Sequence, residues 1–177
     1  MRKEILANIK DGDLFTIAGI EFIKFFDKDG KTFVVAKDSL FNSEFGDNNN
    51  FATSIIKKRL EDEILPKIEK EIGAENVLEH EVDLFSLDGS NKWGKVNCKI
   101  SLPTFDFYRN NRKTFEKYKL GKWYWLSTPD STSEFYLNDD WIVCVSPSGN
   151  IDDNICDDYG GVRPFLTFIS SILVSCK

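Results

Sequence analysis

Three short runs of β-branched and aromatic residues near the start of the chain constrain the fold most strongly. They occupy residues 14–17, 21–26 and 32–36, and the sequences Ala18-Gly19 and Asp27-Lys28-Asp29-Gly30 separate them. β-branched and aromatic side chains favour strands, whereas glycine and aspartate accept the backbone angles of tight hairpin turns. The pattern therefore predicts an N-terminal antiparallel β-meander.

Residues 50–73 predict an amphipathic helix. Their apolar side chains recur mostly at spacings of three and four, and charged side chains fill the other positions. Gly73 fits the end of this helix. Pro66 should kink or break it, because proline has no N–H group for the carbonyl four residues earlier. A second helix is expected over residues 103–118.

The remaining chain alternates between strands and polar loops. Strands are expected at residues 123–127, 141–146, 162–168 and 172–175. The chain has 177 residues, of which 41% are hydrophobic and 29% charged, so it can bury a core without disulfides or a metal. We expect a single domain, 1–177, of the α+β class, with the meander, two main helices and irregular loops over a small twisted sheet.

The formal net charge is −6, and the charges are unevenly distributed. Residues 108–122 carry six Lys and Arg against one Glu, whereas residues 123–162 contain no Lys or Arg. The acidic side chains of the second segment are Asp130, Glu134, Asp139, Asp140, Asp152, Asp153, Asp157 and Asp158. Sequence-independent binding of nucleic acid needs a basic face, so no direct nucleic-acid binding is expected.

Cysteine and histidine usage argues against a bound metal. Cys98, Cys144, Cys156 and Cys176 form no CxxC pair, and His80 is the only histidine. We therefore expect no metal and no cofactor, and a solvent-exposed His80. The N-terminus lacks the apolar core of a signal peptide, and no apolar run is long enough to span a membrane. The expected location is the cytoplasm of a host cell or a virion, without membrane contact.

Several blocks together resemble a large family of uncharacterised bacterial and bacteriophage proteins. That family combines an NNW-x-x-S-x-I-R-x-x-L-N helix start with WWLRSP or WWLATP and a closing GVRPAL. The corresponding blocks here are NNFATSIIKKRL at 49–60, KWYWLSTP at 122–129 and GGVRPFL at 160–166. Phe51 stands where the family usually has Trp. The ending is similar to that of C-type-lectin-like and formylglycine-generating-enzyme-like domains, which implies an α+β, C-type-lectin-like fold.

The motif residues suggest candidate ligand contacts. Trp123 and Trp125, two apart on a strand, share one face and could form a stacking platform for a sugar or base, or pack in the core. Arg163 could bind an anion, or hydrogen-bond loop carbonyls from inside the domain. The sequence Asn138-Asp139-Asp140-Trp141 is similar to a lectin loop for calcium and sugar, but it is short and rich in turn residues, which favours a plain loop.

The leading functional hypothesis is a non-catalytic binding module of phage or mobile-element type. It would present residues 127–160 to a protein or glycan ligand on a rigid scaffold. One alternative is a phage-encoded inhibitor of a host nuclease, whose acidic partner surface imitates nucleic acid. That surface would use Asp130, Glu134, Asp152, Asp153, Asp157 and Asp158. The other alternative is an enzyme of unrecognised type that uses carboxylates.

Overall fold

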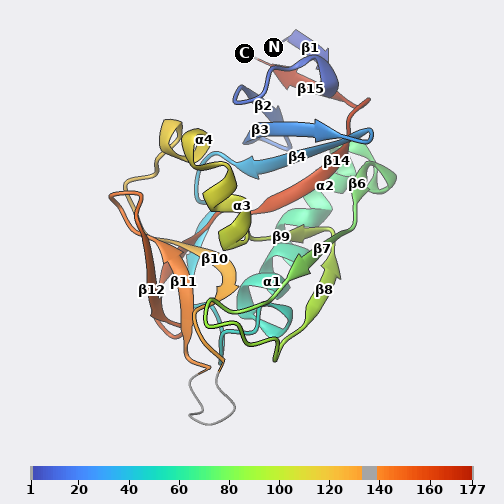
Figure 1. Ribbon diagram of the computed structural model, residues 1–177. Helices are drawn as coiled ribbons and strands as arrows, with labels where there is room; N and C mark the ends of the chain where they lie inside the picture. Colours follow the sequence, from blue (N-terminus) through green and yellow to red (C-terminus); the bar gives the residue numbers. More distant parts are fainter. Residues whose placement is uncertain (1, 133–138, 177) are drawn as a thin grey trace.

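The computed structural model describes residues 2–132 and 139–176, and its fold is α+β (Figure 1). Most of the ordered chain forms strands of curled sheets, and one continuous helical segment spans residues 55–72. The largest sheet has eight strands. They are β1 (Arg2–Ile5), β15 (Leu173–Cys176), β2 (Leu14–Ile17), β3 (Ile20–Lys28), β4 (Lys31–Ala36), β14 (Phe165–Ile169), β6 (Val77–Leu78) and β9 (Ile100–Ser101).

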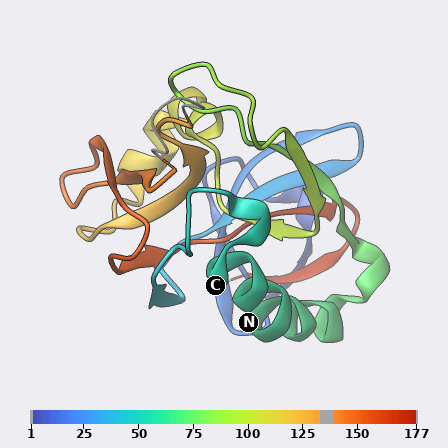
Figure 2. The same cartoon turned by 90° about the horizontal axis from the view of Figure 1, so that it is seen from below.

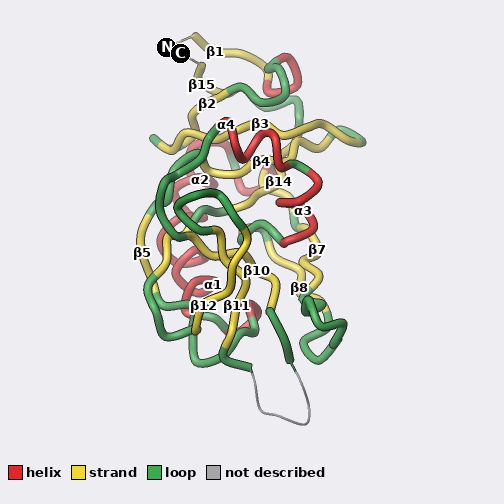
Figure 3. Tube along the Cα trace, turned by 60° about the vertical axis from the view of Figure 1, so that its left-hand side comes forward, coloured by secondary structure: helices red, strands yellow, loops and turns green. Residues whose placement is uncertain are grey.

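A second sheet has five strands and lies at the end of the molecule opposite the paired chain ends (Figure 3). In spatial order these strands are β12 (Ile151–Ile155), β11 (Trp141–Val145), β10 (Tyr124–Pro129), β13 (Gly160–Val162) and β5 (Phe41–Ser43). Strands β10 and β13 are parallel, and the other neighbours are antiparallel. A hairpin of β7 (His80–Asp83) and β8 (Lys95–Cys98) stands apart from both sheets.

The predicted meander is confirmed as β2, β3 and β4. Ala18 and Gly19 connect the first pair with φ angles of 52° and 76°, and Asp29 and Gly30 connect the second with 52° and 73°. Two consecutive positive φ angles give a two-residue turn whose twist matches that of the flanking strands. Glycine at the second position of each turn accepts this conformation without strain.

Strand β3 contains a bulge that the alternation of side chains did not reveal. The register shifts between Lys24, opposite Val34, and Phe26, opposite Phe33, so Phe25 is an extra residue. A bulge re-aims the side chains around it. Phe25 and Phe26 consequently both pack with the smaller core cluster, and Lys24 lies under the N-terminal turn η1 (Leu6–Asn8).

The helix expected at 50–73 is confirmed over 55–72, whereas Phe51–Thr53 form a separate 3-10 turn, and Pro66 does not break the helix. It runs through α1 (Ile55–Arg59), a π-helical turn at Leu60–Ile64 and α2 (Leu65–Ile72). Within the turn the Leu65 N–H donates to the Leu60 carbonyl, five residues earlier. The widened turn accommodates the missing N–H group of Pro66 without a break in the helix. It places the proline at the start of α2. Ser54 caps the helix, and Gly73, with φ of 89°, ends it.

The helix expected at 103–118 forms as two short helices. Helix α3 (Phe105–Asn110) begins after Thr104, whose hydroxyl accepts the Phe107 N–H at 3.1 Å. Asn111 leaves the helical conformation, with φ of −118° and ψ of 23°, and α4 (Arg112–Lys117) follows it. Together they cover one side of the large sheet and the concave side of β10 and β11 (Figure 1).

Two hydrophobic clusters lie on opposite faces of β3 and β4. Phe22 and Val34 belong to the larger cluster, beneath the helix at 55–72, whereas Ile23 and Val35 belong to the smaller, beneath α3 and α4. Seen from below, the five-stranded sheet lies to the left and the helix and large sheet to the right (Figure 2). Across the described residues, every helix is too short or too polar to cross a membrane.

Candidate functional site

The two tryptophans of the KWYWLSTP block do not form one platform. Trp125 is 1% exposed, its Nε1 donates to the Ser43 carbonyl at 2.9 Å, and its ring meets Phe45 edge-on. Trp123 is 41% exposed and lies just before β10. The platform prediction is therefore wrong for the pair, because Trp125 is inside the fold where β10 packs against β13, and only Trp123 can reach a ligand.

Arg163 is 0% exposed and has no direct access to solvent. Its Nε donates to the Ala36 carbonyl at 2.7 Å, and its Nη2 donates to the Tyr118 carbonyl at 3.2 Å. The guanidinium lies 5.4 Å from the ring centres of Phe115 and Tyr124. Burial lowers its pKa, and Tyr124 opposes this effect. These contacts are those of a structural arginine, so it is not a direct ligand contact.

Asp139 and Asp140 diverge instead of converging on a cation. The Asp139 carboxylate is paired with Lys92, and its backbone carbonyl accepts the Asn49 N–H at 2.6 Å. Asp140 lines a pocket on the other side. Trp141, the last residue of this motif, is partly exposed at the start of β11, opposite Ile155.

Asn49 of the NNF block is buried at the base of this region. Its Nδ2 donates to the carbonyls of Ser131 and Trp141, both at 2.8 Å, and its Oδ1 accepts from Trp93 Nε1 at 2.9 Å. One asparagine therefore joins four segments of the chain and fixes the start of β11. A buried amide with its hydrogen bonds satisfied is a positioning element.

The acidic residues do not share one face. On β12, Asp152 lies opposite Cys144, in the larger core cluster, and Asp153 lies opposite Val143, in the smaller. Residues opposite one another on antiparallel strands point to the same face, so these two carboxylates point to different faces. Burial raises the pKa of Asp130, and nearby Asp153 raises it further.

The remaining predicted carboxylates fall into other places. Asp158 accepts from Asn154 Nδ2 at 2.8 Å, and this bond lowers its pKa. Asp157 lines the same pocket as Asp140. Glu134 and Asn138 lie outside the described residues. In the part of the chain that the structure describes, no group of three or more His, Cys, Asp and Glu side chains is arranged to hold a metal ion.

The strongest candidate site is a carboxylate-lined pocket of about 350 Å³ at the end of β11 and β12. Asp140, Asp157, Glu44 and Asp47 contribute its acidic side chains. Two backbone hydrogen bonds hold the segments together. Cys156 N–H donates to the Asp140 carbonyl at 2.8 Å, and Phe45 N–H donates to the Cys156 carbonyl at 2.9 Å.

Exposed apolar side chains border this pocket. Trp141 and Ile155 are cross-strand partners, both partly exposed, and Ile155 also lines the pocket. Tyr159 is 65% exposed, and the register of β13 with β5 places it next to the Gly160 and Ser43 pair, opposite Glu44. We call Trp141, Ile155, Tyr159 and the four carboxylates the acidic end of the molecule. Its geometry suits a ligand with both cationic and apolar parts.

Sequence reasoning missed Glu44 and Asp47 as site residues. Both belong to the polar loop after β5, which pairs with the chain around Cys156 only in the folded protein. Burial raises the pKa of Cys156 to about 12, and Asp140 and Asp157 add to the effect. This thiol therefore stays protonated and is a packing residue, not a nucleophile.

His80 differs from the sequence expectation. It is mostly buried, with its Nε2 2.8 Å from the Ser101 hydroxyl and its ring edge-on to Phe165 at 4.8 Å. Burial lowers its pKa to about 4, so it is neutral near pH 7. It lines a small aromatic pocket of about 170 Å³ together with Phe26, Phe33 and Phe107. The expectation of an exposed histidine was wrong, because the His80 side chain packs against Phe165 of β14 and Ser101 of β9.

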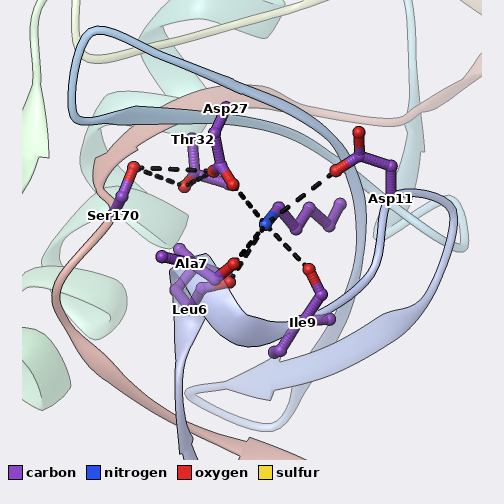
Figure 4. Close-up of polar contacts among 8 residues, drawn as sticks. Leu6, Ala7, Ile9, Asp11, Asp27, Thr32 and Ser170 are labelled. Carbon is purple, nitrogen blue, oxygen red and sulfur yellow. Dashed lines mark hydrogen bonds and ion pairs between the residues drawn. The ribbon is translucent and has the colours of Figure 1, made fainter.

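A buried lysine, Lys24, lies at the centre of a dense polar cluster (Figure 4). Lys24 Nζ donates to the carbonyls of Leu6 and Ala7, each at 3.2 Å, and of Ile9 at 2.8 Å. It also pairs with Asp27 at 2.5 Å. The ammonium has more acceptors than protons to donate, so no N–H group remains to bind a substrate. Its role is to hold the N-terminal turn against β3.

Comparison with known proteins identifies no relative of this chain. No family model, no curated protein and no solved structure matches the chain.

Proposed function

We propose that the protein is a non-catalytic binding module whose acidic end binds a basic segment of another protein. The observation that carries the proposal is the exposed Trp141 and Ile155 pair beside a pocket lined by four carboxylates. Interface centres are enriched in aromatic side chains, and complementary charge steers and orients the partner. A partner segment with Lys or Arg next to an apolar residue would satisfy both features.

The backbone around the acidic end favours binding without large rearrangement. Asn49 fixes the start of β11, and the bonds through Cys156 fix the loop after β5. A site held by buried hydrogen bonds loses little conformational entropy when it binds. The residues involved belong largely to 127–160, the segment expected to present the ligand contacts.

A protein ligand is favoured over a glycan held through calcium. Calcium needs six or more oxygen ligands that converge on one point. Asp139 is committed to Lys92, and Asp140 faces the other way, into the pocket. Trp125 is buried, so no paired platform is available for a sugar ring.

The nuclease-inhibitor alternative remains a version of this proposal with a specific partner. Such an inhibitor would have to bind its partner through both faces of β12 at once, because Asp152 and Asp153 point to opposite sides. The finer fold assignment also belongs here. In C-type-lectin-like domains irregular loops lie over a small twisted sheet, and the acidic end, built from loops around the five-stranded sheet, supports that assignment.

Selection of random displayed peptides on the folded protein tests the proposal. We expect enriched peptides to combine Lys or Arg with an aromatic or aliphatic residue. The Asp140→Asn/Asp157→Asn double variant should weaken their binding about tenfold at low salt and less at high salt. The matched control is Glu75→Gln/Glu79→Gln, which removes two exposed carboxylates elsewhere and should leave affinity unchanged.

Three results would count against the proposal. They are enriched peptides without basic residues, a control variant that weakens binding as much as the pocket variant, and an unchanged affinity of Trp141→Ser. Binding on a glycan array that is lost with Trp141→Ser would instead favour the glycan alternative.

A further inference from the structure

A second pocket, of about 360 Å³, lies where the end of β4 meets the end of α4. Lys37 and Asp38 line it from one side, and Lys117, Lys119 and Lys122 line it from the other. The lining holds four lysines and one carboxylate, and because Lys37 and Lys117 pair with Glu21 and Asp13 outside it, Lys119 and Lys122 carry the excess positive charge. It is separate from the acidic end and plays no part in the proposed function.

Two of the four lysines are uncommitted. Lys37 pairs with Glu21 at 2.9 Å, and Lys117 donates to the Gly12 carbonyl at 2.8 Å. Lys119 and Lys122 make no ion pair or hydrogen bond with any residue among 2–132 and 139–176. The backbone N–H groups of residues 119–122 likewise donate to no described acceptor. A run of free N–H groups beside ammonium groups is the donor arrangement that oxyanions prefer.

Arg163 adds positive charge behind the pocket. Its Nη2 is bonded to the carbonyl of Tyr118, a residue of the pocket wall, and all its hydrogen bonds go to neutral carbonyls. Nη1 donates no hydrogen bond of normal geometry to a described residue, and the nearby Tyr124 hydroxyl only partly offsets the lowering of the Arg163 pKa by burial. No carboxylate pairs directly with the guanidinium, and the carboxylate that acts on its charge at longer range is Asp38, on the pocket wall.

We propose that this pocket binds a small molecule through a diphosphate group. A diphosphate supplies several oxyanion acceptors for Lys119, Lys122 and the free N–H groups between them. The pocket volume is at the lower end of the range for small-molecule sites, about 300–1,000 Å³, and exceeds what one phosphate would fill. Trp123 follows Lys122 directly in the chain and is 41% exposed.

Asp38 opposes this binding and provides an internal check. Its carboxylate lines the pocket and lies 3.7 Å from Lys37. An anion entering the pocket must overcome repulsion from this carboxylate. Asp38→Asn should therefore tighten diphosphate binding about threefold, an effect opposite in sign to that of the lysine variants.

The test is calorimetric titration of the full chain with inorganic pyrophosphate at low ionic strength, without added metal. Lys119→Gln/Lys122→Gln should weaken binding about tenfold or more, because two charge-assisted hydrogen bonds are lost. The control Lys28→Gln/Lys31→Gln removes two exposed lysines that flank the β3–β4 turn and should leave the affinity within about twofold. Circular dichroism of each variant checks that the fold is intact.

A second arm distinguishes free pyrophosphate from a nucleoside diphosphate. If ADP binds more tightly than pyrophosphate and Trp123→Leu removes the difference, the ligand is a nucleoside diphosphate stacked on Trp123. Equal affinities would support recognition of the diphosphate alone. The proposal is overturned if pyrophosphate and ADP give no binding at millimolar concentration, or if both lysine pairs weaken binding equally. It is also overturned if Asp38→Asn weakens binding.

Discussion

Two buried cations in this protein have opposite surroundings. Lys24, 1% exposed, is enclosed by three carbonyls and the Asp27 carboxylate, and Asp27 in turn accepts a hydrogen bond from Thr32. Arg163, 0% exposed, contacts two carbonyls and two aromatic rings, and no carboxylate pairs with it directly, although the more distant Asp38 acts on its charge. One charge is paired with a carboxylate in its cage, and the other interacts with a carboxylate only at longer range.

The difference separates a structural cation from one that acts at a distance. A buried ion pair with its hydrogen bonds satisfied has little field outside its cage, and removal of one partner is costly. Arg163 has no such cage, and the carboxylate that acts on its charge, Asp38, is a wall residue of the lysine-lined pocket. Burial alone therefore does not tell whether a charge stabilises the fold or prepares a binding site.

The largest effect is expected from Lys24→Met. It leaves the Asp27 carboxylate and three carbonyls without their donor and should lower the free energy of unfolding by about 3–4 kcal/mol. Arg163→Met should cost about 2 kcal/mol, because it frees two carbonyls but also removes a buried charge that no carboxylate pairs with directly. Urea denaturation of the two variants beside the wild type measures both values.

The control for this comparison is Lys28→Met, an exposed lysine on the same strand. It should change the free energy of unfolding by less than about 0.5 kcal/mol. If Arg163→Met costs more than Lys24→Met, the contrast between the two cations is wrong.

His80 provides a pH-dependent contrast, since it is a buried base that stays neutral. Its pKa is about 4 in the folded protein, below the ordinary value of 6.5, so the unfolded chain takes up the proton first as pH falls. Stability should be fully present above pH 6.5 and decrease toward pH 4, by at most about 3 kcal/mol.

Thermal unfolding of wild type and His80→Asn at several pH values between 4 and 7 measures this effect. The difference between the two proteins removes contributions from carboxylates that they share. A constant difference across the range would show that His80 does not contribute to the pH dependence.

The smallest effect is expected from Asp27→Asn, which removes the nearer of the two carboxylates at Lys24 and leaves Asp11, 3.9 Å from Nζ. The three carbonyls remain, and the new amide oxygen can still accept a hydrogen bond. Asp27 is also 34% exposed, so solvent screens its pairing with Lys24. The free energy of unfolding should fall by about 1 kcal/mol in urea denaturation. A loss as large as that of Lys24→Met would mean that the carboxylate, and not the carbonyls, holds the lysine.

Local signals predicted the elements that local chemistry determines. The β-meander follows from Ala18-Gly19 and Asp29-Gly30, which form the two turns. The helix at 55–72 follows from its apolar spacing, but the sequence could not show that a π-helical turn would accommodate Pro66. The bulge at Phe25 was equally hidden, because a one-residue shift of register is decided by packing on both faces of β3.

The candidate site was predictable only in part. Asp140, Trp141 and Asp157 were identified from the acidic segment, and all three lie at the acidic end. Glu44 and Asp47 come from a loop distant in sequence, which backbone pairing brings to the site. The alternation rule placed Trp123 and Trp125 on one face of a strand, but it could not show that β10 begins after Trp123 and buries Trp125.

The pairing of β1 with β15 sets how the molecule responds to mechanical force. Arg2 lies opposite Cys176, so the two chain ends are neighbours on adjacent antiparallel strands (Figures 1 and 3). A pull applied between these ends loads the hydrogen bonds of the pair one after another, as in opening a zipper, and does not shear them all at once. The molecule should therefore yield at low force and peel from this edge, while the acidic end remains folded until the later steps.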